Sequence, residues 1–248
     1  MREWRAERFR ARVLRVTRRV RNVANGQVVG GPFSGMTYID RSHCSQLAPK
    51  LLGTYEREWH DVLAVIGARS PDRIVDAGAA EGYFAVGLLR LVPTATVVAF
   101  EAETAARDDL HALATANGVA DRIEALGRCD APALQAALAG AARPFVLMDI
   151  EGGELEVLDP ARVNALRHAC ILVELHPEVI PDVRKVLSDR FAATHMVRYI
   201  PAVDRTTQEL PGTHFLSGAD LLAATWEGRS DGQGWLWMEP RDADLPRG

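Results

Sequence analysis

Acidic residues and one histidine follow two hydrophobic runs in the middle of the sequence. Asp149, Glu151 and Glu154 come after the run FVLM, and Glu174 and His176 lie at the end of the run ILVEL. A histidine titrates near neutral pH, so His176 could take a proton from a substrate hydroxyl. Alternatively, Asp149, Glu174 and His176 could bind Mg²⁺ or a similar ion that acidifies the hydroxyl. These three residues are the predicted catalytic and metal-binding set. The simpler alternatives are that Glu151 or Glu154 caps a following helix and that His176 satisfies a turn.

A turn of small residues follows an earlier hydrophobic run that ends in an acid. In VDAGAAEGYF, Asp76 ends the run, and Gly78 and Gly82 allow a tight turn and a close approach of the backbone to a ligand. The G-x-G-x-x-G signature of dinucleotide sites is incomplete, because Ala80 occupies the middle glycine position. This favours an adenosyl ligand without phosphates over a dinucleotide.

Two further acids end later hydrophobic runs. Glu101 lies 25 residues after Asp76, where a carboxylate can accept hydrogen bonds from both ribose hydroxyls. Asp130, next to Cys129, follows the run RIEALG. It could meet an adenine amino group, or it could cap the helix that APALQAAL predicts.

Short hydrophobic runs alternate with Ala- and Leu-rich stretches from Arg73 onward. The candidate strands are RIVDAG, TVVAFEA, RIEALG, FVLMDI, CILVEL, HMVRYI and GWLWMEP. Helices are expected near 83–91, 103–117, 131–140, 153–167, 178–190 and 217–225. This order predicts a Rossmann-like α/β fold with a mostly parallel seven-stranded sheet, an antiparallel last strand and helices on both faces. Ligands of such sheets lie beyond the carboxyl ends of the strands, so the acids and the histidine that end the fourth and fifth strands should face the reacting group of a bound ligand.

The N-terminal segment differs in charge from the rest of the chain. The first 26 residues hold nine arginines and two glutamates, a charge of +7, which leaves −11 for the remainder. Apolar residues at helical spacing from Phe9 to Val23 predict a basic amphipathic helix that ends at Asn25 and Gly26. We expect this helix to pack on its own domain or on a second subunit, with RNA or membrane-surface binding as the alternatives.

Composition and cysteine spacing narrow the class of protein. A chain of 248 residues with 48% hydrophobic residues can bury one large core. The absence of an 18-residue apolar run and of a signal-peptide pattern predicts a cytoplasmic protein without a membrane span. Cys44, Cys129 and Cys170 form no C-x-x-C pair, so we expect reduced thiols and no zinc cluster.

The order of VDAGAAEG, VVAFEAE, ANGV, LMDIEGGELEVLD and ILVELHPE resembles the FkbM family of S-adenosylmethionine-dependent methyltransferases, and LLGTYERE resembles the segment ahead of the family's domain. The resemblance covers roughly residues 45–180, with DIEGGE as its most specific part. The residue pattern predicts an N-terminal helix and loop over 1–47, a domain over 48–240 that opens with a helix over about 48–66, and a tail over 241–248. The resemblance implies that the domain over 48–240 is a class I methyltransferase domain. Ala80 stands where the family often has Asn, and Met148 where a Lys commonly precedes the acid.

The resemblance also implies S-adenosylmethionine as cofactor and methyl transfer to a hydroxyl of a small molecule, such as a sugar, a glycosylated natural product or a polyketide-like compound. It further suggests a contact from Glu56. The predicted cofactor contacts are Tyr55, Asp76, Gly78, Ala79, Glu81, Gly82, Glu101, Ala102, Cys129, Asp130 and Asp149.

Other functions and features stay open at this point. The basic first helix would suit an RNA methyltransferase, and the fold alone would suit a non-catalytic adenosyl-binding module. A dinucleotide oxidoreductase is disfavoured by the missing glycine. The first helix also makes a homodimer a reasonable expectation. The insertion over 201–233, with Arg205, His214 and Trp226, could form a substrate wall or simply pack against the sheet edge.

Overall fold

A computed structural model describes residues 2–203, 214–229 and 232–241, and the chain divides into two compact units. The first unit comprises Met1–Arg57 and Val203–Arg229, and the second comprises Glu58–Ala202 and Ser230–Gly248. The division therefore falls about ten residues later than the predicted boundary at 47, and residues 214–229 of the insertion belong to the same unit as the N-terminal helix. Nearly all of the predicted tail lies outside the described residues. No helix in the described part of the chain combines the length and hydropathy needed to cross a membrane.

The second unit is built on a seven-stranded sheet with the order β3-β2-β1-β4-β5-β7-β6. Strand β7 runs antiparallel to both of its neighbours, and the other pairs are parallel, as predicted. Because β1 is flanked by β2 and β4, the carboxyl ends of these strands lie together at the point where the strand order reverses. The strands are β1 Arg73–Ala77, β2 Thr96–Phe100, β3 Ile123–Leu126, β4 Pro144–Met148, β5 Cys170–Leu175, β6 His195–Pro201 and β7 Gly234–Pro240.

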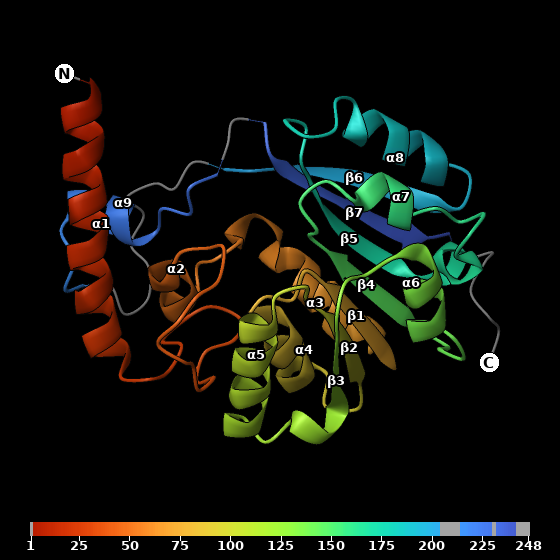
Figure 1. The fold of residues 1–248 in the computed structure, drawn as a ribbon, viewed down its shortest axis with the longest axis horizontal. Coiled ribbons are helices and arrows are strands. Elements are labelled where there is room, and N and C mark those ends of the chain that lie inside the picture. The colour runs from red at the N-terminus through yellow and green to blue at the C-terminus, as the bar shows by residue number, and fades with distance from the viewer. Residues whose placement is uncertain (1, 204–213, 230–231, 242–248) are drawn as a thin grey trace. The chain divides into compact units, whose positions relative to one another are not determined.

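Helices cover both faces of this sheet, which also confirms the prediction (Figure 1). The central strands are therefore buried on both sides, and β4 and β5 contain no exposed residue. The cores of the two faces hold different side chains: Met148 belongs to the face with α6 to α8, whereas Trp59 and Trp235, with ring centroids 5.5 Å apart, pack on the opposite face. The helices are α6 Ala131–Ala137, α7 Glu154–Val157 and α8 Val183–Phe191 on one face, and α3 His60–Arg69, α4 Tyr83–Leu91 and α5 Thr104–Ala116 on the other.

The single helix predicted over 48–66 is wrong. The chain instead forms α2 (Leu47–Leu52), then a 3-10 turn at Arg57–Trp59, and then α3. Gly53 ends α2 with a left-handed φ of 72°. A Cβ there would lie 1.9 Å from the carbonyl oxygen of Gly30, so the close approach of two backbone segments, and not helix propensity, decides the break.

The helix predicted over 153–167 is also interrupted. Helix α7 ends at Val157, and a separate 3-10 turn covers Asn164–His168. Pro160 lies between them and cannot continue a helix, and the Asp159 carboxylate accepts a hydrogen bond from the Ala161 amide at 2.9 Å. The result is a short helix whose N-terminus lies just after the end of β4.

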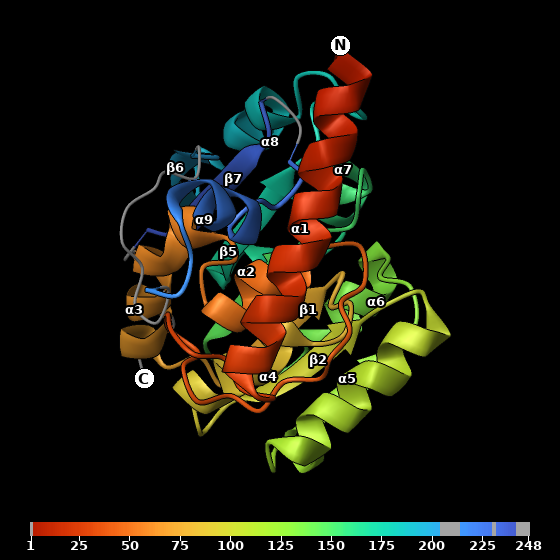
Figure 2. The ribbon, with the colours of Figure 1, turned by 90° about the vertical axis from the view of Figure 1, so that its left-hand side faces the viewer.

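The first unit contains α1 (Arg2–Ala24), which lies beside α2 and α9 (Gly218–Ala224) (Figure 2). The apolar stripe predicted for this helix is buried at Val13, Val16 and Val20. Asp220 on α9 accepts hydrogen bonds from Arg15 and Arg19 at 3.0 and 2.8 Å. The basic helix thus packs within its own unit, and part of its charge is paired there.

Asp72 connects the starts of three strands and gives a test of the fold. Its carboxylate accepts hydrogen bonds from the backbone amides of Ala142 and Arg143, both at 2.8 Å. Its backbone carbonyl accepts a hydrogen bond from the Thr96 amide at 3.1 Å. Burial alone would raise the pKa of Asp72, but the backbone hydrogen bonds outweigh it and hold the pKa below its usual 3.8. The carboxylate therefore stabilises the fold above the pKa of the unfolded chain, and this contribution is lost as the pH falls through the folded pKa.

We expect Asp72→Ala to lower the free energy of unfolding by about 1 kcal/mol at neutral pH, a figure reduced for the partial exposure of the site. Urea unfolding at neutral and at strongly acidic pH measures this, with the exposed Asp108→Ala on α5 as control. Equal stability of the two variants at neutral pH would contradict the prediction.

Candidate functional site

In the loop after β1, the backbone itself lies close to the carboxyl edge of the sheet. Gly78, Ala80 and Gly82 have positive φ values of 87°, 46° and 90°. A Cβ at Gly78 would lie 1.7 Å from the carbonyl oxygen of Asp149, whose amide donates to Ala77 at 2.8 Å. The loop and the end of β4 are therefore in direct backbone contact, which only glycine permits at position 78.

Glu101, directly after β2, turns its carboxylate toward this loop. Oε2 accepts the Ala80 amide at 2.9 Å, and Oε1 accepts the Glu103 amide at 2.8 Å. Each carboxylate oxygen has a second lone-pair position, so the side chain can still accept hydrogen bonds from two hydroxyls. The two amides fix the orientation of this carboxylate.

The other predicted cofactor residues of this unit occupy different environments. Asp76, Ala79 and Glu81 are buried, with Glu81 completely enclosed, whereas Ala102 is exposed. Asp130 is the N-cap of α6 and accepts the Ala133 amide at 2.8 Å, which is the simpler of its two predicted roles. Its part in adenine binding stays a prediction.

Cys129 and Cys170 are buried thiols with raised pKa values. Burial, and secondly the charge of Asp130, raises the pKa of Cys129 to about 12, and burial raises that of Cys170 to about 11. Cys44 is exposed. Because the thiolate is the reactive form, we expect a thiol-specific disulfide reagent at mildly alkaline pH to label Cys44 quickly and the other two only after denaturation. Rapid labelling of a Cys44→Ser variant in the native state would contradict this.

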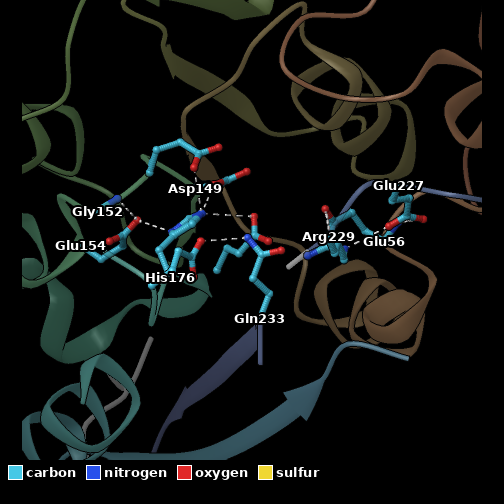
Figure 3. A network of polar contacts seen from close by, with 11 residues as sticks. Glu56, Asp149, Gly152, Glu154, His176, Glu227, Arg229 and Gln233 are labelled. Carbon is cyan, nitrogen blue, oxygen red and sulfur yellow. Dashed lines mark hydrogen bonds and ion pairs between the residues drawn. The ribbon is translucent and has the colours of Figure 1, made fainter. Parts of the chain in front are cut away.

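His176 is the centre of a carboxylate cluster between the ends of β4 and β5 (Figure 3). Its Nδ1 lies 3.0 Å from Oε1 of Glu154, within hydrogen-bonding distance. Its Nε2 lies 3.3 Å from Oε2 of Glu151, 3.5 Å from Oδ1 of Asp149 and 4.0 Å from Oε2 of Glu174. The sheet thus brings the three predicted catalytic residues together, as their positions at adjacent strand ends required.

The cluster changes the titration of its members. Burial alone would lower the pKa of His176, but the hydrogen bond with Glu154 and the charges of Glu174, Glu154 and Glu151 outweigh it and raise the pKa. Burial alone would raise the pKa of Glu154, but its hydrogen bonds with His176 and with the Gly152 amide lower it. This edge of the sheet therefore favours positive charge at the imidazole and negative charge at Glu154.

Two members of the cluster have roles that sequence reasoning did not assign. Helix capping was the alternative for Glu151 and Glu154, and Glu154 does lie in the first turn of α7, where a negative charge is favoured. Glu154 is completely buried and bonds His176 and the Gly152 amide. Glu151 has a left-handed φ of 57° and lies nearer to Nε2 than Glu174 does. The only advance signal was the glycine pair in DIEGGE, which permits such a turn.

The predicted contacts Tyr55 and Glu56 belong to the first unit. The Lys50 ammonium lies 4.9 Å from the centre of the Tyr55 ring. Glu56 is buried and forms an ion pair with Arg229, which also pairs with Glu227 at 3.1 Å (Figure 3). Contacts of Tyr55 and Glu56 with a cofactor stay predictions.

The insertion before β7 is described only in part. Arg205 lies outside the described residues, and His214 is exposed. Trp226 packs edge-on against Phe9 of α1, with ring centroids 5.4 Å apart. Trp226 thus has a packing role within the first unit, and a substrate wall formed by the insertion stays a prediction.

Comparison with known proteins yields matches of structure only. No protein family model and no curated protein matches the sequence. The O-methyltransferase from Bacillus cereus, solved with S-adenosylhomocysteine, matches with a TM-score of 0.50 and 14% identity, over 73% of this chain and 79% of that one. An O-methyltransferase from Streptomyces achromogenes involved in tomaymycin synthesis, solved with S-adenosylmethionine, matches with a TM-score of 0.44 and 19% identity, over 57% of this chain and 71% of that one. With the observed strand order, the first likeness shows that this chain has the Rossmann-like fold of class I methyltransferases.

Proposed function

We propose that this protein is an S-adenosylmethionine-dependent O-methyltransferase of the FkbM type that acts on a hydroxyl group of a small molecule. A sugar, a glycosylated natural product or a polyketide-like compound is the substrate class that the resemblance favours. The main support is the Glu101 carboxylate, which two backbone amides hold beside the glycine loop after β1. This arrangement suits recognition of the ribose of an adenosyl ligand.

The residues at the ends of β1 and β2 fit S-adenosylmethionine. Glu101 would accept hydrogen bonds from the ribose hydroxyls. The loop turns at Gly78, where the backbone of Asp149 leaves no room for a side chain. Asp76 and Asp149 lie at the ends of the strands that flank this loop. When bound, this cofactor supplies a methyl group activated by a sulfonium. The protein must then align an acceptor oxygen with that methyl group and exclude water.

In this proposal, the cluster at the ends of β4 and β5 acts on the acceptor hydroxyl. A hydroxyl becomes a better nucleophile as its proton is removed, which requires a basic atom nearby. The carboxylates of Asp149 and Glu174 are basic atoms of this kind, and so is Nε2 of His176 when the imidazole is neutral. Because the imidazole is almost completely buried and bonded to Glu154, its orientation is set before a substrate arrives.

The pairing of arginines in the first unit favours a small-molecule substrate over RNA. Arg12, Arg15 and Arg19 all form ion pairs with Asp220, and Arg21 pairs with Asp40 at 2.9 Å. These charges contribute to packing within the unit, which weakens the argument from the basic composition of α1 for phosphate binding.

Calorimetric titration of the purified protein with S-adenosylhomocysteine tests the proposal, with NADH as the control ligand. We expect one S-adenosylhomocysteine to bind per chain and NADH to show no heat of binding. If S-adenosylhomocysteine binds, the protein would then be screened for methyl transfer from labelled S-adenosylmethionine to hydroxylated metabolites. Binding of NADH in place of S-adenosylhomocysteine would overturn the proposal, as would the absence of binding of either ligand.

A further inference from the structure

We propose that Asp149, Glu151 and His176 form a binding site for a divalent transition-metal ion such as Mn²⁺. One carboxylate oxygen from each acid and one imidazole nitrogen all lie within 4.8 Å of one another. The set differs from the ligands predicted from the sequence, because Glu151 replaces Glu174 and the imidazole nitrogen favours a transition metal over Mg²⁺.

The separations of these atoms suit a shared ion. Nε2 of His176 lies 3.3 Å from Oε2 of Glu151 and 3.5 Å from Oδ1 of Asp149. Two ligand atoms that each lie about 2.1 Å from one metal ion are roughly 3 to 3.5 Å apart when they subtend an angle of about 90 to 110°. The two separations from Nε2 fit these values, and the chosen oxygens of Asp149 and Glu151 lie within 4.8 Å of each other. Glu151, whose side chain is 71% exposed, can move to bring its oxygen to the ion.

The site differs from a simple group of acids because it contains a buried imidazole. His176 is 1% exposed, and its Nδ1 is bonded to Glu154. Its Nε2 points toward the carboxylates of Asp149 and Glu151. Among the described residues, the hydrogen bond of this ring is the one at Nδ1. Metal-binding histidines characteristically donate their second ring N–H to a carboxylate, which leaves the other nitrogen for the metal. Glu154 would be this outer partner, itself held by the Gly152 amide at 3.0 Å.

The role of the ion, though not its binding, rests on the proposed methyl transfer. The ligand Asp149 follows β4, where its backbone touches the loop at Gly78. An acceptor hydroxyl bound to the ion would have a lowered pKa, and its proton would pass to a nearby carboxylate. Because Nε2 would be occupied, Glu174, whose Oε2 lies 4.0 Å from Nε2, is the remaining member of the predicted catalytic set for this step. The oxygen would then form a bond to the methyl carbon as the bond from carbon to sulfur breaks.

Titration of the metal-free full-length protein with Mn²⁺, followed by electron paramagnetic resonance, tests the site. We compare the wild type with Glu151→Gln and with Glu156→Gln, which removes the same charge from an exposed position on α7. We expect one Mn²⁺ per chain, an affinity at least about tenfold lower for Glu151→Gln, and an unchanged affinity for Glu156→Gln. Mg²⁺ should compete weakly. Glu151 is exposed, so its substitution should leave the fold intact, which thermal unfolding checks.

Two results would overturn this inference: no Mn²⁺ binding by the wild type, or equal affinities of the two variants. If Mg²⁺ bound to the site with the same affinity as Mn²⁺, the choice of a transition metal would be overturned. S-Adenosylhomocysteine binding, measured separately on the metal-free protein, distinguishes these failures from failure of the proposed function. A protein that binds Mn²⁺ but no adenosyl ligand would retain the cation site and lose the methyltransferase assignment.

Discussion

Replacing Glu101 with Ala should weaken binding of S-adenosylhomocysteine by about 1.5 to 3 kcal/mol, or roughly 10- to 150-fold. The physical reason is the loss of charge-assisted hydrogen bonds from the ribose hydroxyls to a carboxylate that the Ala80 and Glu103 amides hold in place. Calorimetric titration of the variant measures the effect directly, without knowledge of the methyl acceptor.

Glu103→Ala is the matched control for this prediction. Glu103 is exposed, and its backbone amide, not its side chain, contacts Glu101. The control variant should therefore bind the ligand with nearly wild-type affinity. If both variants bound S-adenosylhomocysteine equally well, Glu101 would not be the ribose ligand.

Replacing Gly78 with Ala should give the largest loss of stability among single substitutions in the loop after β1. The new Cβ would lie 1.7 Å from the backbone oxygen of Asp149, and the φ of 87° is unfavourable for any residue with a side chain. A backbone atom cannot rotate away as a flexible side chain can, so either the loop or the end of β4 must move. We expect a cost of about 3 to 5 kcal/mol and a decrease in the unfolding temperature on the order of 10 °C.

Two other glycines separate the causes of this loss. Gly118 has a positive φ of 66°, and a Cβ added there would meet no atom within 4 Å, so Gly118→Ala should show only conformational strain, of about 1 kcal/mol. Gly127 has open space and no positive φ, so Gly127→Ala should be close to neutral. Thermal unfolding of all three variants tests this, with cofactor binding as a second measurement. If Gly78→Ala were as stable as Gly127→Ala, the prediction would be wrong.

The sheet and the edge that holds the site could be predicted from the sequence. Parallel strands that are buried on both faces appear as continuous hydrophobic runs, and the acids that end those runs must lie at one edge of the sheet. This reasoning places Glu101 beside the glycine loop and brings Asp149 and Glu174 toward His176. It depends only on residue type, on order along the chain and on the right-handed crossovers that parallel strands require.

Tertiary structure alone decided which side chains complete the site. The partners of His176 depend on the left-handed backbone of Glu151 and on the turn at Gly152, which bring Glu151 and Glu154 to opposite ring nitrogens. Spacing along the chain does not specify such backbone angles. The pairing of Asp220 with arginines about 200 residues earlier and the break at Gly53 likewise depend on contacts between distant segments. Local sequence determines which structures a segment can form, whereas the packing of distant segments selects one of them, because burial and hydrogen bonding are satisfied only in the complete fold.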